Sequence, residues 1–181
     1  MKDRAALAAL LRERSLTFGD FVLSSGQRST YYIDARKTTM SAEGQALIGP
    51  VALQAIRDAG WDPDSVGGLT MGADPVAYSI ARASVDEPPM IQAFSVRKEA
   101  KGHGTRRQIE GNFSPGARVV VIEDVITSGG SALRAIEAVR AEGARVLGVL
   151  ALVDRGQGGR TAIETAGVGV VSIATTTDLG I

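Results

Sequence analysis

The sequence predicts an α/β fold, in which a central parallel sheet is flanked by helices and joined by a small N-terminal hood. From residue 41 onward, short apolar runs alternate with helix-forming runs, which is typical of a parallel sheet with helices on both faces. The first forty residues do not follow this alternation. A chain of 181 residues is long enough for one domain with a real core. We therefore expect a hood over residues 1–40 and a core over 41–181, within one compact domain.

The hood is expected to contain a helix and a pair of strands. Leu7, Leu10 and Leu11 fall on one helical face, so residues 2–15 are predicted to form an amphipathic helix. Residues 30–33 are rich in good strand formers and are predicted to form a short strand. These elements do not continue the strand–helix alternation, so we expect them to form a separate cap.

The core elements follow from apolar runs and from helix-start signals. Ser41 suits the N-cap of the helix that follows it, and Pro75 suits the first turn of the next helix. Residues 98–112 have no usable periodicity and hold three glycines, so a long loop is expected there. The predicted elements, in chain order, are a helix over 42–58, a strand over 66–69, a helix over 75–84, strands over 90–96 and 118–122, a helix over 131–142, a strand over 146–153, a helix over 160–166 and a strand over 168–173.

The composition argues against several classes of protein. Twenty basic and twenty acidic residues cancel, so no overall field recruits nucleic acid or an anionic membrane. The chain has no cysteine, which excludes a disulfide framework and fits a reducing compartment. No apolar run approaches the ~20 residues that a transmembrane helix needs, and the N-terminus does not resemble a signal peptide. We expect a cytoplasmic protein without a nucleic-acid or membrane partner.

Residues 119–133 are the most informative run of the sequence. Four apolar residues lead into the acid pair Glu123 and Asp124, and a glycine- and hydroxyl-rich turn at 127–131 precedes a helix. The N-terminus of a helix suits a phosphate, and carboxylates at the end of a buried strand lie where α/β folds bind ligands. Two carboxylates would repel a bare phosphate, so the ligand should also carry hydroxyls or a magnesium ion. The run indicates a sugar-phosphate site, and the alternative is an ordinary strand–helix junction.

A second run, at residues 97–107, is strongly basic. It holds six cations if His103, the single histidine of the chain, is counted, and glycines flank this histidine on both sides. A solvated charged loop and a nucleic-acid patch are the alternatives. The flanking glycines favour a mobile lid that closes over a substrate, and a loop longer than about 12–15 residues is usually functional or disordered.

These two runs resemble motifs of a known family. Residues 119–133 resemble the phosphoribosyl pyrophosphate (PRPP) signature of type I phosphoribosyltransferases. The spacing Lys98-x-x-Lys101-x-His103-Gly104, followed by Ile-Glu-Gly at 109–111, resembles the catalytic loop of orotate phosphoribosyltransferases. Further likenesses cover most of the chain and include the hood segments at 21–26 and 31–34, the pyrophosphate turn at 72–75 and the base-recognition pair Asp154-Arg155.

The resemblance implies the type I phosphoribosyltransferase fold and a specific reaction. The ribose 5-phosphate group of PRPP would pass to orotate and give orotidine 5′-monophosphate and pyrophosphate, a step of de novo pyrimidine (UMP) biosynthesis. Mg²⁺ would be held mainly by PRPP and water, without a dedicated cage of protein ligands. The loop at 97–111 would act in the site of the neighbouring subunit, which implies a homodimer.

The resemblance also implies roles for individual residues. Lys101, His103 and Asp124 would be catalytic, and Thr127 and Arg155 would contact orotate. Glu123 and Asp124 would hold the ribose hydroxyls, and the turn after them would hold the 5′-phosphate. The residues implied in PRPP binding are Arg97, Lys98, Lys101, His103, Glu123, Asp124, Val125, Ile126, Thr127, Ser128, Gly129, Gly130 and Ser131.

Two departures from the family pattern remove cations. Ser24 stands where many members carry a lysine in the hood, and Ala73-Asp74-Pro75 stands where many carry Tyr-Lys. Two other functions stay open on the PRPP run alone: a purine phosphoribosyltransferase, and a PRPP-sensing regulatory protein of the same fold that binds RNA or DNA. The Lys-His loop argues against the first alternative. The balanced net charge argues against the second.

Overall fold

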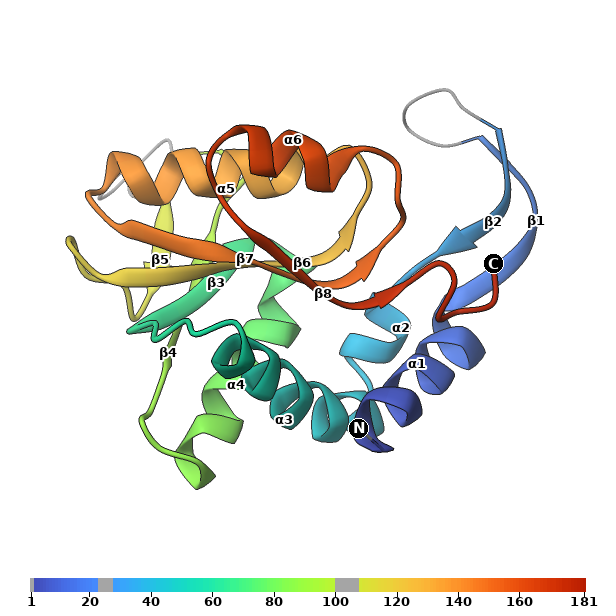
Figure 1. Ribbon diagram of the computed structural model, residues 1–181, viewed down its shortest axis with the longest axis horizontal. Coiled ribbons are helices and arrows are strands. Elements are labelled where there is room, and N and C mark those ends of the chain that lie inside the picture. Colours follow the sequence, from blue (N-terminus) through green and yellow to red (C-terminus); the bar gives the residue numbers. More distant parts are fainter. Residues whose placement is uncertain (1, 23–27, 100–107) are drawn as a thin grey trace.

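A central sheet with helices on both faces organises the structure, a computed structural model that describes residues 2–22, 28–99 and 108–181 (Figure 1). Helices α5 and α6 lie on one face of the sheet, and α1, α3 and α4 lie on the other. The elements of the described residues are α1 (Lys2–Ser15), β1 (Leu16–Val22), β2 (Arg28–Ile33), α2 (Arg36–Thr39), α3 (Ala42–Asp58), β3 (Ser65–Leu69), α4 (Ala73–Asp86), β4 (Gln92–Val96), β5 (Ile109–Gly111), β6 (Arg118–Ile126), α5 (Gly130–Ala141), β7 (Arg145–Asp154), α6 (Gly159–Thr165) and β8 (Val170–Thr175).

Within the described ranges, the main sheet has six strands in the order β5-β4-β3-β6-β7-β8. Strands β4, β3, β6, β7 and β8 run parallel to one another, so the predicted parallel sheet is confirmed. Strand β5 is antiparallel to β4. The expectation of an unbroken loop over 98–112 was therefore wrong at its end, because a three-residue strand is too short to produce a periodic pattern.

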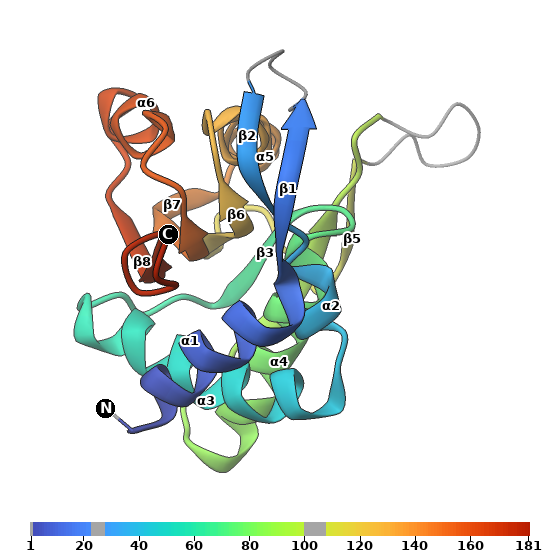
Figure 2. The ribbon, with the colours of Figure 1, turned by 90° about the vertical axis from the view of Figure 1, so that its right-hand side faces the viewer.

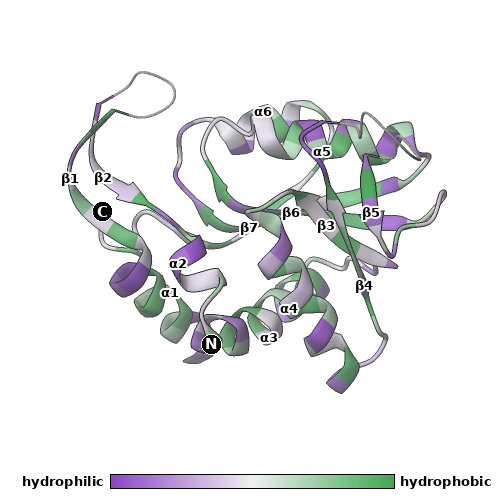
Figure 3. Ribbon diagram, turned by 180° about the vertical axis from the view of Figure 1, so that it is seen from behind, coloured by the Kyte–Doolittle hydropathy of each residue, from purple (hydrophilic) through white to green (hydrophobic). Residues whose placement is uncertain are grey.

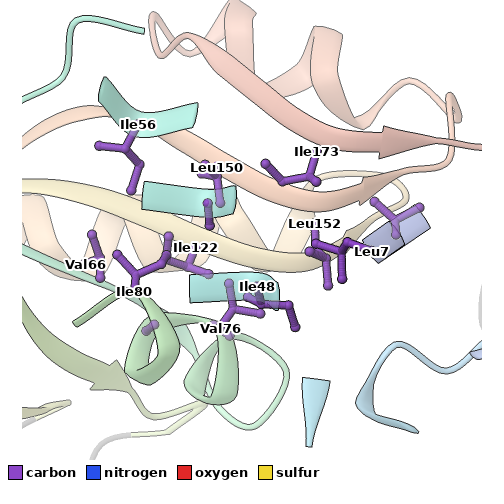
Figure 4. Close-up of a cluster of buried hydrophobic side chains, with 14 of the residues drawn as sticks. Leu7, Ile48, Ile56, Val66, Val76, Ile80, Ile122, Leu150, Leu152 and Ile173 are labelled. Atoms are coloured by element: carbon purple, nitrogen blue, oxygen red, sulfur yellow. The ribbon is translucent and has the colours of Figure 1, made fainter. Parts of the chain in front are cut away.

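The sheet separates two hydrophobic cores. Alternate residues of a strand point to opposite faces, so Ile122 packs toward α3 and α4 whereas Val121 packs toward α5. Figure 4 shows the first core, in which Ile48 of α3 and Ile80 of α4 meet Ile122 and Leu150 of the sheet. A sheet covered on both faces explains why β6 and β7 are continuous apolar runs in the sequence.

Helices α4 and α5 are amphipathic, and α3 begins where the sequence predicts. Hydrophilic and hydrophobic residues alternate along α4 and α5 (Figure 3), because only one side of each helix meets the sheet. The Ser41 hydroxyl accepts a hydrogen bond of 3.0 Å from the backbone N–H of Gly44, which confirms the predicted N-cap of α3. Within the described residues, no helix is both long and apolar enough to cross a membrane.

The N-terminal residues contribute to two different structures. Strands β1 and β2 pair antiparallel as a ribbon that projects from the body of the molecule (Figure 2). Helix α1 instead packs with Leu7 and Leu11 into the same core as α3. The backbone N–H of Asp34 donates to the carbonyl of Ser15 at 2.9 Å, which fixes the end of the ribbon to the end of α1. A division at residue 40 stays a prediction.

Strand β6 is longer than predicted. The sequence suggests a strand that ends at Ile122, but β6 continues to Ile126 and pairs with β7 as far as Ile126 opposite Asp154. This pairing explains the extra length, because hydrogen bonds to a neighbouring strand keep polar and apolar residues alike in an extended conformation. Glu123 and Asp124 are therefore part of the sheet, which fixes their backbone in space.

Candidate active site

A cavity of about 580 Å³ opens where the carboxyl ends of β3 and β6 face the hood. Its walls come from four parts of the chain: the end of β2 with the start of α2, the turn after β3, the end of β4, and β6 with the first turn of α5. The lining residues are Tyr32, Ile33, Asp34, Ala35, Arg36, Leu69, Thr70, Met71, Gly72, Lys98, Glu123, Asp124, Val125 and Ser131. The position agrees with the rule that open α/β sheets bind ligands beyond the carboxyl ends of their strands.

The acid pair lies side by side on β6 at the floor of this cavity, with unequal environments. Glu123 is only 9% exposed. Burial, reinforced by the charge of Asp124, raises the pKa of Glu123 to about 9. Asp124 is less buried, and its Oδ1 accepts a hydrogen bond of 2.9 Å from the backbone N–H of Val125. At neutral pH Glu123 therefore presents a neutral carboxyl that can donate a hydrogen bond, which suits a neighbouring hydroxyl.

The turn after β3 is built closely against Asp124. A Cβ atom added to Gly72 would lie 2.5 Å from Asp124 Oδ2, closer than real Cβ atoms approach. Only glycine therefore lets this turn and the Asp124 carboxylate occupy their present positions. The packing places a second backbone segment directly beside Asp124.

The glycine-rich turn at 127–131 brings the N-terminus of α5 to the cavity. Gly129 is the N-cap of α5 and has φ of 81°, a left-handed conformation that favours glycine. A Cβ at Gly129 would also lie 2.8 Å from the carbonyl oxygen of Gly159, so α6 packs tightly against the turn. Ser131, in the first turn of α5, lines the cavity. Backbone N–H groups at this helix start are available to an anion.

Not every residue implied in PRPP binding lines the cavity with its side chain. Of that set, the residues that line the cavity are Lys98, Glu123, Asp124, Val125 and Ser131. The side chain of Ile126 is buried in the core beside α5, so any contact it makes with a ligand is through its main chain. Thr127, Ser128, Gly129 and Gly130 form the turn itself, and their contacts with a ligand stay predictions.

Arg155 follows β7 immediately and is buried, with 7% of its surface exposed. Its guanidinium lies over the ring of Tyr31, 4.8 Å from the ring centroid. Its Nε and Nη2 atoms have no hydrogen-bond partner among the described residues. The adjacent Asp154 does not fill this role, because its carboxylate binds Arg160 Nε at 3.0 Å and the N–H of Gly156 at 2.9 Å.

A buried guanidinium without an anionic partner is costly, and such groups are rare unless a ligand completes them. The backbone N–H of Arg155 donates to the carbonyl of Ile126 at 3.1 Å, so this cation is attached to the end of the strand that carries the acid pair. The acid pair lies two residues before the end of β6, and Arg155 follows the end of β7, so the two belong to neighbouring strands. Arg155 and Thr127 are not among the residues that line the cavity, and their contacts with orotate stay predictions.

The basic loop is described only at its two ends. Lys98 is exposed and lines the cavity. Arg97 does not line it; its Nε donates to Glu110 Oε1 at 3.0 Å, across the short β4–β5 pairing. Lys101 and His103 lie outside the described residues, so their catalytic roles stay predictions.

Sequence reasoning missed Arg36, one of the charged residues that line the cavity. Asp34 and Arg36 both line it and form a two-point ion pair, with Arg36 Nε at 2.8 Å from Asp34 Oδ1 and Arg36 Nη2 at 3.2 Å from Asp34 Oδ2. The pair lies at the joint between β2 and α2, where no periodic pattern draws attention to it. The available signal was the spacing of an acid and an arginine two residues apart directly after a predicted strand.

Comparisons with known proteins agree with this geometry. A family model described as "Phosphoribosyl transferase domain" matches residues 41–174. The orotate phosphoribosyltransferase of Aquifex aeolicus is 48% identical over 176 residues, which cover 96% of this chain and 95% of that protein. The orotate phosphoribosyltransferase of Corynebacterium glutamicum strain R is 45% identical over 181 residues, which cover 100% and 96%.

A solved structure has the same fold. The crystal structure of Mycobacterium tuberculosis H37Rv orotate phosphoribosyltransferase in complex with PRPP has a TM-score of 0.85 and 42% sequence identity to this chain, and the match covers 99% of both chains. Identity at this level over the whole length shows the family as well as the fold. The chain belongs to the orotate phosphoribosyltransferase family, whose members carry the phosphoribosyl transferase domain.

Proposed function

We propose that this protein is a glycosyltransferase that moves the ribose 5-phosphate group of PRPP to orotate, giving orotidine 5′-monophosphate and pyrophosphate. One observation carries the proposal: the buried, unpaired guanidinium of Arg155 is attached, through its backbone bond to Ile126, to the end of the strand that carries the acid pair. The acid pair suits a sugar with free hydroxyls, and the guanidinium suits a base with a carboxylate.

The sugar half of the substrate follows from β6 and α5. The oxygens of Asp124 would accept from a ribose hydroxyl, and the neutral carboxyl of Glu123 would donate to the neighbouring one. The 5′-phosphate would lie at the start of α5, where the turn at 127–131 supplies N–H groups, hydroxyls and the positive end of the helix dipole. The sugar is then held at both ends before the reaction begins, which lowers the entropy cost of reaching the transition state.

The base half follows from Arg155 and Tyr31. A guanidinium offers two parallel N–H donors that match both oxygens of a carboxylate, and orotate carries such a carboxylate. The Tyr31 ring lies under the guanidinium, within the range of a cation–π contact. A purine base has no carboxylate to pair with this buried cation, so the site favours orotate over the purine alternative. Thr127 would add a hydroxyl contact to orotate.

The leaving pyrophosphate gains negative charge as the bond to the anomeric carbon breaks. Cations at this point stabilise the transition state, and one such contact is typically worth ~3–4 kcal/mol. Lys98 lines the cavity, and Lys101 and His103 belong to the same basic run. We assign the leaving-group contacts to Lys101 and His103, acting in the site of a second subunit of a homodimer. Closure of the loop that carries them would also exclude water, which would otherwise attack the activated sugar.

The residues of the cavity fit a magnesium ion that is bound chiefly by substrate. Residues 2–22, 28–99 and 108–181 contain no cluster of three or more acidic or histidine side chains able to cage a metal. Glu123 and Asp124 are the carboxyl groups of the β6 wall that could support an ion bound to PRPP. Mg²⁺ usually keeps several waters and takes substrate phosphates as ligands, so it needs few carboxyl ligands from the protein. When bound, it would neutralise charge on the pyrophosphate.

The test is a panel of acceptor bases. The protein is incubated with PRPP and Mg²⁺ and with orotate, guanine or adenine, and nucleotide products are separated by chromatography. We expect orotidine 5′-monophosphate from orotate and no nucleotide from the purines. Turnover of a purine without turnover of orotate would contradict the proposal. A salt-titrated RNA-binding assay covers the regulatory alternative, for which tight and strongly salt-dependent binding without turnover is the expected result. The proposed location is the cytoplasm, in line with a chain that has no cysteine.

A further inference from the structure

We propose that Arg36, held in place by Asp34, is the hood residue that binds the pyrophosphate group of PRPP. The inference rests on the proposed function for the identity of the ligand and adds a substrate-binding residue to it. It starts from a shortage of positive charge in the cavity. Asp34, Glu123 and Asp124 line the cavity, and the described cations that face them from its walls are Arg36 and Lys98.

The position of Arg36 agrees with the end of the substrate that needs a cation. The 5′-phosphate is assigned to the start of α5 and the ribose hydroxyls to the acid pair. In PRPP the carbon that carries pyrophosphate is next to the 2′-hydroxyl, at the end of the sugar opposite the 5′-phosphate. Pyrophosphate would therefore lie beyond the acid pair, on the side opposite the 5′-phosphate. Gly72 packs against Asp124 and the charge of Asp124 reaches Arg36, and α2, which carries Arg36, lies on the other side of the sheet from α5 (Figure 1).

The guanidinium is oriented but not used up. Asp34 accepts from Nε at 2.8 Å and from Nη2 at 3.2 Å. A guanidinium has five N–H donors, so these two bonds leave the Nη1 edge available to a ligand. The structure shows no bond from Nη1 to the described residues. Phosphate oxygens match this planar edge, and such charge-assisted bonds are among the strongest in proteins.

The electrostatics are those of a cation that faces an acidic wall. The hydrogen bond from Arg36 and its charge lower the pKa of Asp34, so the pair stays ionised. The pKa of Arg36 is raised first by Asp34, and the charge of Asp124 adds to this effect, which places the guanidinium within reach of the acid pair's field. The Arg36 side chain is 48% exposed, and ion pairs at that exposure contribute little to folding. We therefore assign the pair a role in binding a ligand in the cavity and not in stabilising the fold.

The experiment compares two ligands that differ only in the pyrophosphate group. Binding of PRPP and of ribose 5-phosphate is measured by calorimetry with the wild type and with Arg36→Ala, Arg36→Lys and Asp34→Asn. We expect Arg36→Ala to weaken PRPP by about tenfold or more, because charge-assisted bonds to phosphate are lost. Ribose 5-phosphate should change by less than about twofold. Arg36→Lys should recover part of the PRPP affinity, and Asp34→Asn should fall between wild type and Arg36→Ala.

Another exposed arginine of the N-terminal residues, also in an ion pair, serves as a matched control. Arg14 is an exposed arginine with one ion pair, to Glu43 at 3.1 Å, and it does not line the cavity. Arg14→Ala should leave the affinity for both ligands unchanged. Thermal unfolding of every variant separates a binding defect from a folding defect.

Two results would overturn the inference: equal weakening of PRPP and ribose 5-phosphate by Arg36→Ala, or no weakening of either. The parallel assay with orotate keeps its failure distinct from that of the proposed function. Turnover of orotate with PRPP binding that does not depend on Arg36 rejects only the role of Arg36. Arg36-dependent PRPP binding without turnover of orotate rejects only the proposed acceptor. A wild type that binds no PRPP rejects both.

Discussion

The two walls of the cavity are built on different principles. The β6 wall, with Glu123 and Asp124, belongs to the central sheet and is held by pairing with β7 and by the turn at Gly72. The hood wall, with Asp34 and Arg36, lies outside that sheet and is oriented by one ion pair and by the bond from Asp34 to Ser15. The comparison suggests that the sugar end of the site is preset by the core, whereas the pyrophosphate end is set by local contacts.

The carboxyl groups of the two walls differ in the same way. Burial raises the pKa of Glu123 to about 9, whereas the hydrogen bond from Arg36 lowers the pKa of Asp34. The first carboxyl is neutral at physiological pH and the second is charged. A change on the β6 wall should therefore affect stability and catalysis together, and a change on the hood wall should affect ligand binding with little effect on stability.

The largest effect is expected from Asp124→Asn. The amide keeps the size of the side chain but removes its negative charge. The carboxylate oxygens would accept hydrogen bonds from the ribose hydroxyls, and their charge would stabilise the cationic sugar of the transition state. We expect kcat/KM for PRPP to fall by about a hundredfold or more, while circular dichroism shows an intact fold. Activity within a few-fold of wild type would remove Asp124 from the catalytic site.

A smaller loss is expected from Gly72→Ala. The added Cβ would lie 2.5 Å from Asp124 Oδ2, so the carboxylate or the turn must shift. We expect kcat/KM to fall by roughly tenfold, since small displacements of positioning groups are costly. In the double variant with Asp124→Asn, the two losses should not add, because Gly72 acts through Asp124. Full additivity in steady-state kinetics would show that Gly72 has a separate role.

Glu123→Gln should change how stability depends on pH. Glu123 has an ordinary pKa of 4.5, and its pKa is about 9 in the folded protein, so between these values the folded state holds one more proton than the unfolded state. Its contribution is fully present below the lower value and is lost as pH rises toward the higher one, by up to about 1.4 kcal/mol per pH unit.

The glutamine variant should remove this slope. Denaturant unfolding at about pH 6 and about pH 9 measures it. We expect wild type to lose more stability than Glu123→Gln over this interval. An identical pH dependence in both proteins would show that Glu123 does not titrate as a buried group.

The free protein should gain stability from Arg155→Met. The guanidinium is buried without partners for Nε and Nη2, and replacement of buried charges by apolar groups of similar volume is often neutral or stabilising by about 1–4 kcal/mol. We expect a higher melting temperature in the absence of ligand and a large rise in KM for orotate. A lower melting temperature would mean that stacking on Tyr31 outweighs the desolvation cost.

The smallest effect is expected from Arg14→Ala, an exposed position near the end of α1. Its ion pair with Glu43 is exposed on both sides, and such pairs contribute about 0–1 kcal/mol. Unfolding in denaturant should show a change within that range and no change in turnover. A larger loss would show that the packing of α1 against α3 depends on this pair.

The sequence predicts the core of the fold well, because its signals are local. A buried parallel strand is a continuous apolar run, and the Ser41 cap is read from one residue and the helix after it. Strand β5 could not be predicted in this way. Three residues carry no period, and β5 exists because it pairs with β4 across the basic loop.

The site likewise has parts that are predictable from local sequence and parts that depend on residues far apart in the chain. The acid pair and the turn after it are contiguous in sequence, so their chemistry was predictable, although the extension of β6 through Glu123 was not. Arg155 was implied by resemblance alone. Its stacking on Tyr31 joins two segments that are far apart in the chain, and no local pattern reveals it. Arg36 was missed because its importance comes from the cavity that it faces.

The proposed site binds the sugar phosphate at β6 and α5 and the base carboxylate at Arg155. The most direct test compares the affinity for the product nucleotide with the affinity for the same nucleotide without its carboxylate. Orotidine 5′-monophosphate and uridine 5′-monophosphate share the ribose phosphate and differ at the group that Arg155 would bind. Wild type should bind the carboxylated nucleotide about tenfold to a hundredfold more tightly, and Arg155→Met should remove this preference while keeping its affinity for uridine 5′-monophosphate. Equal affinities in wild type, or a preference that survives in Arg155→Met, would contradict an orotate site at Arg155.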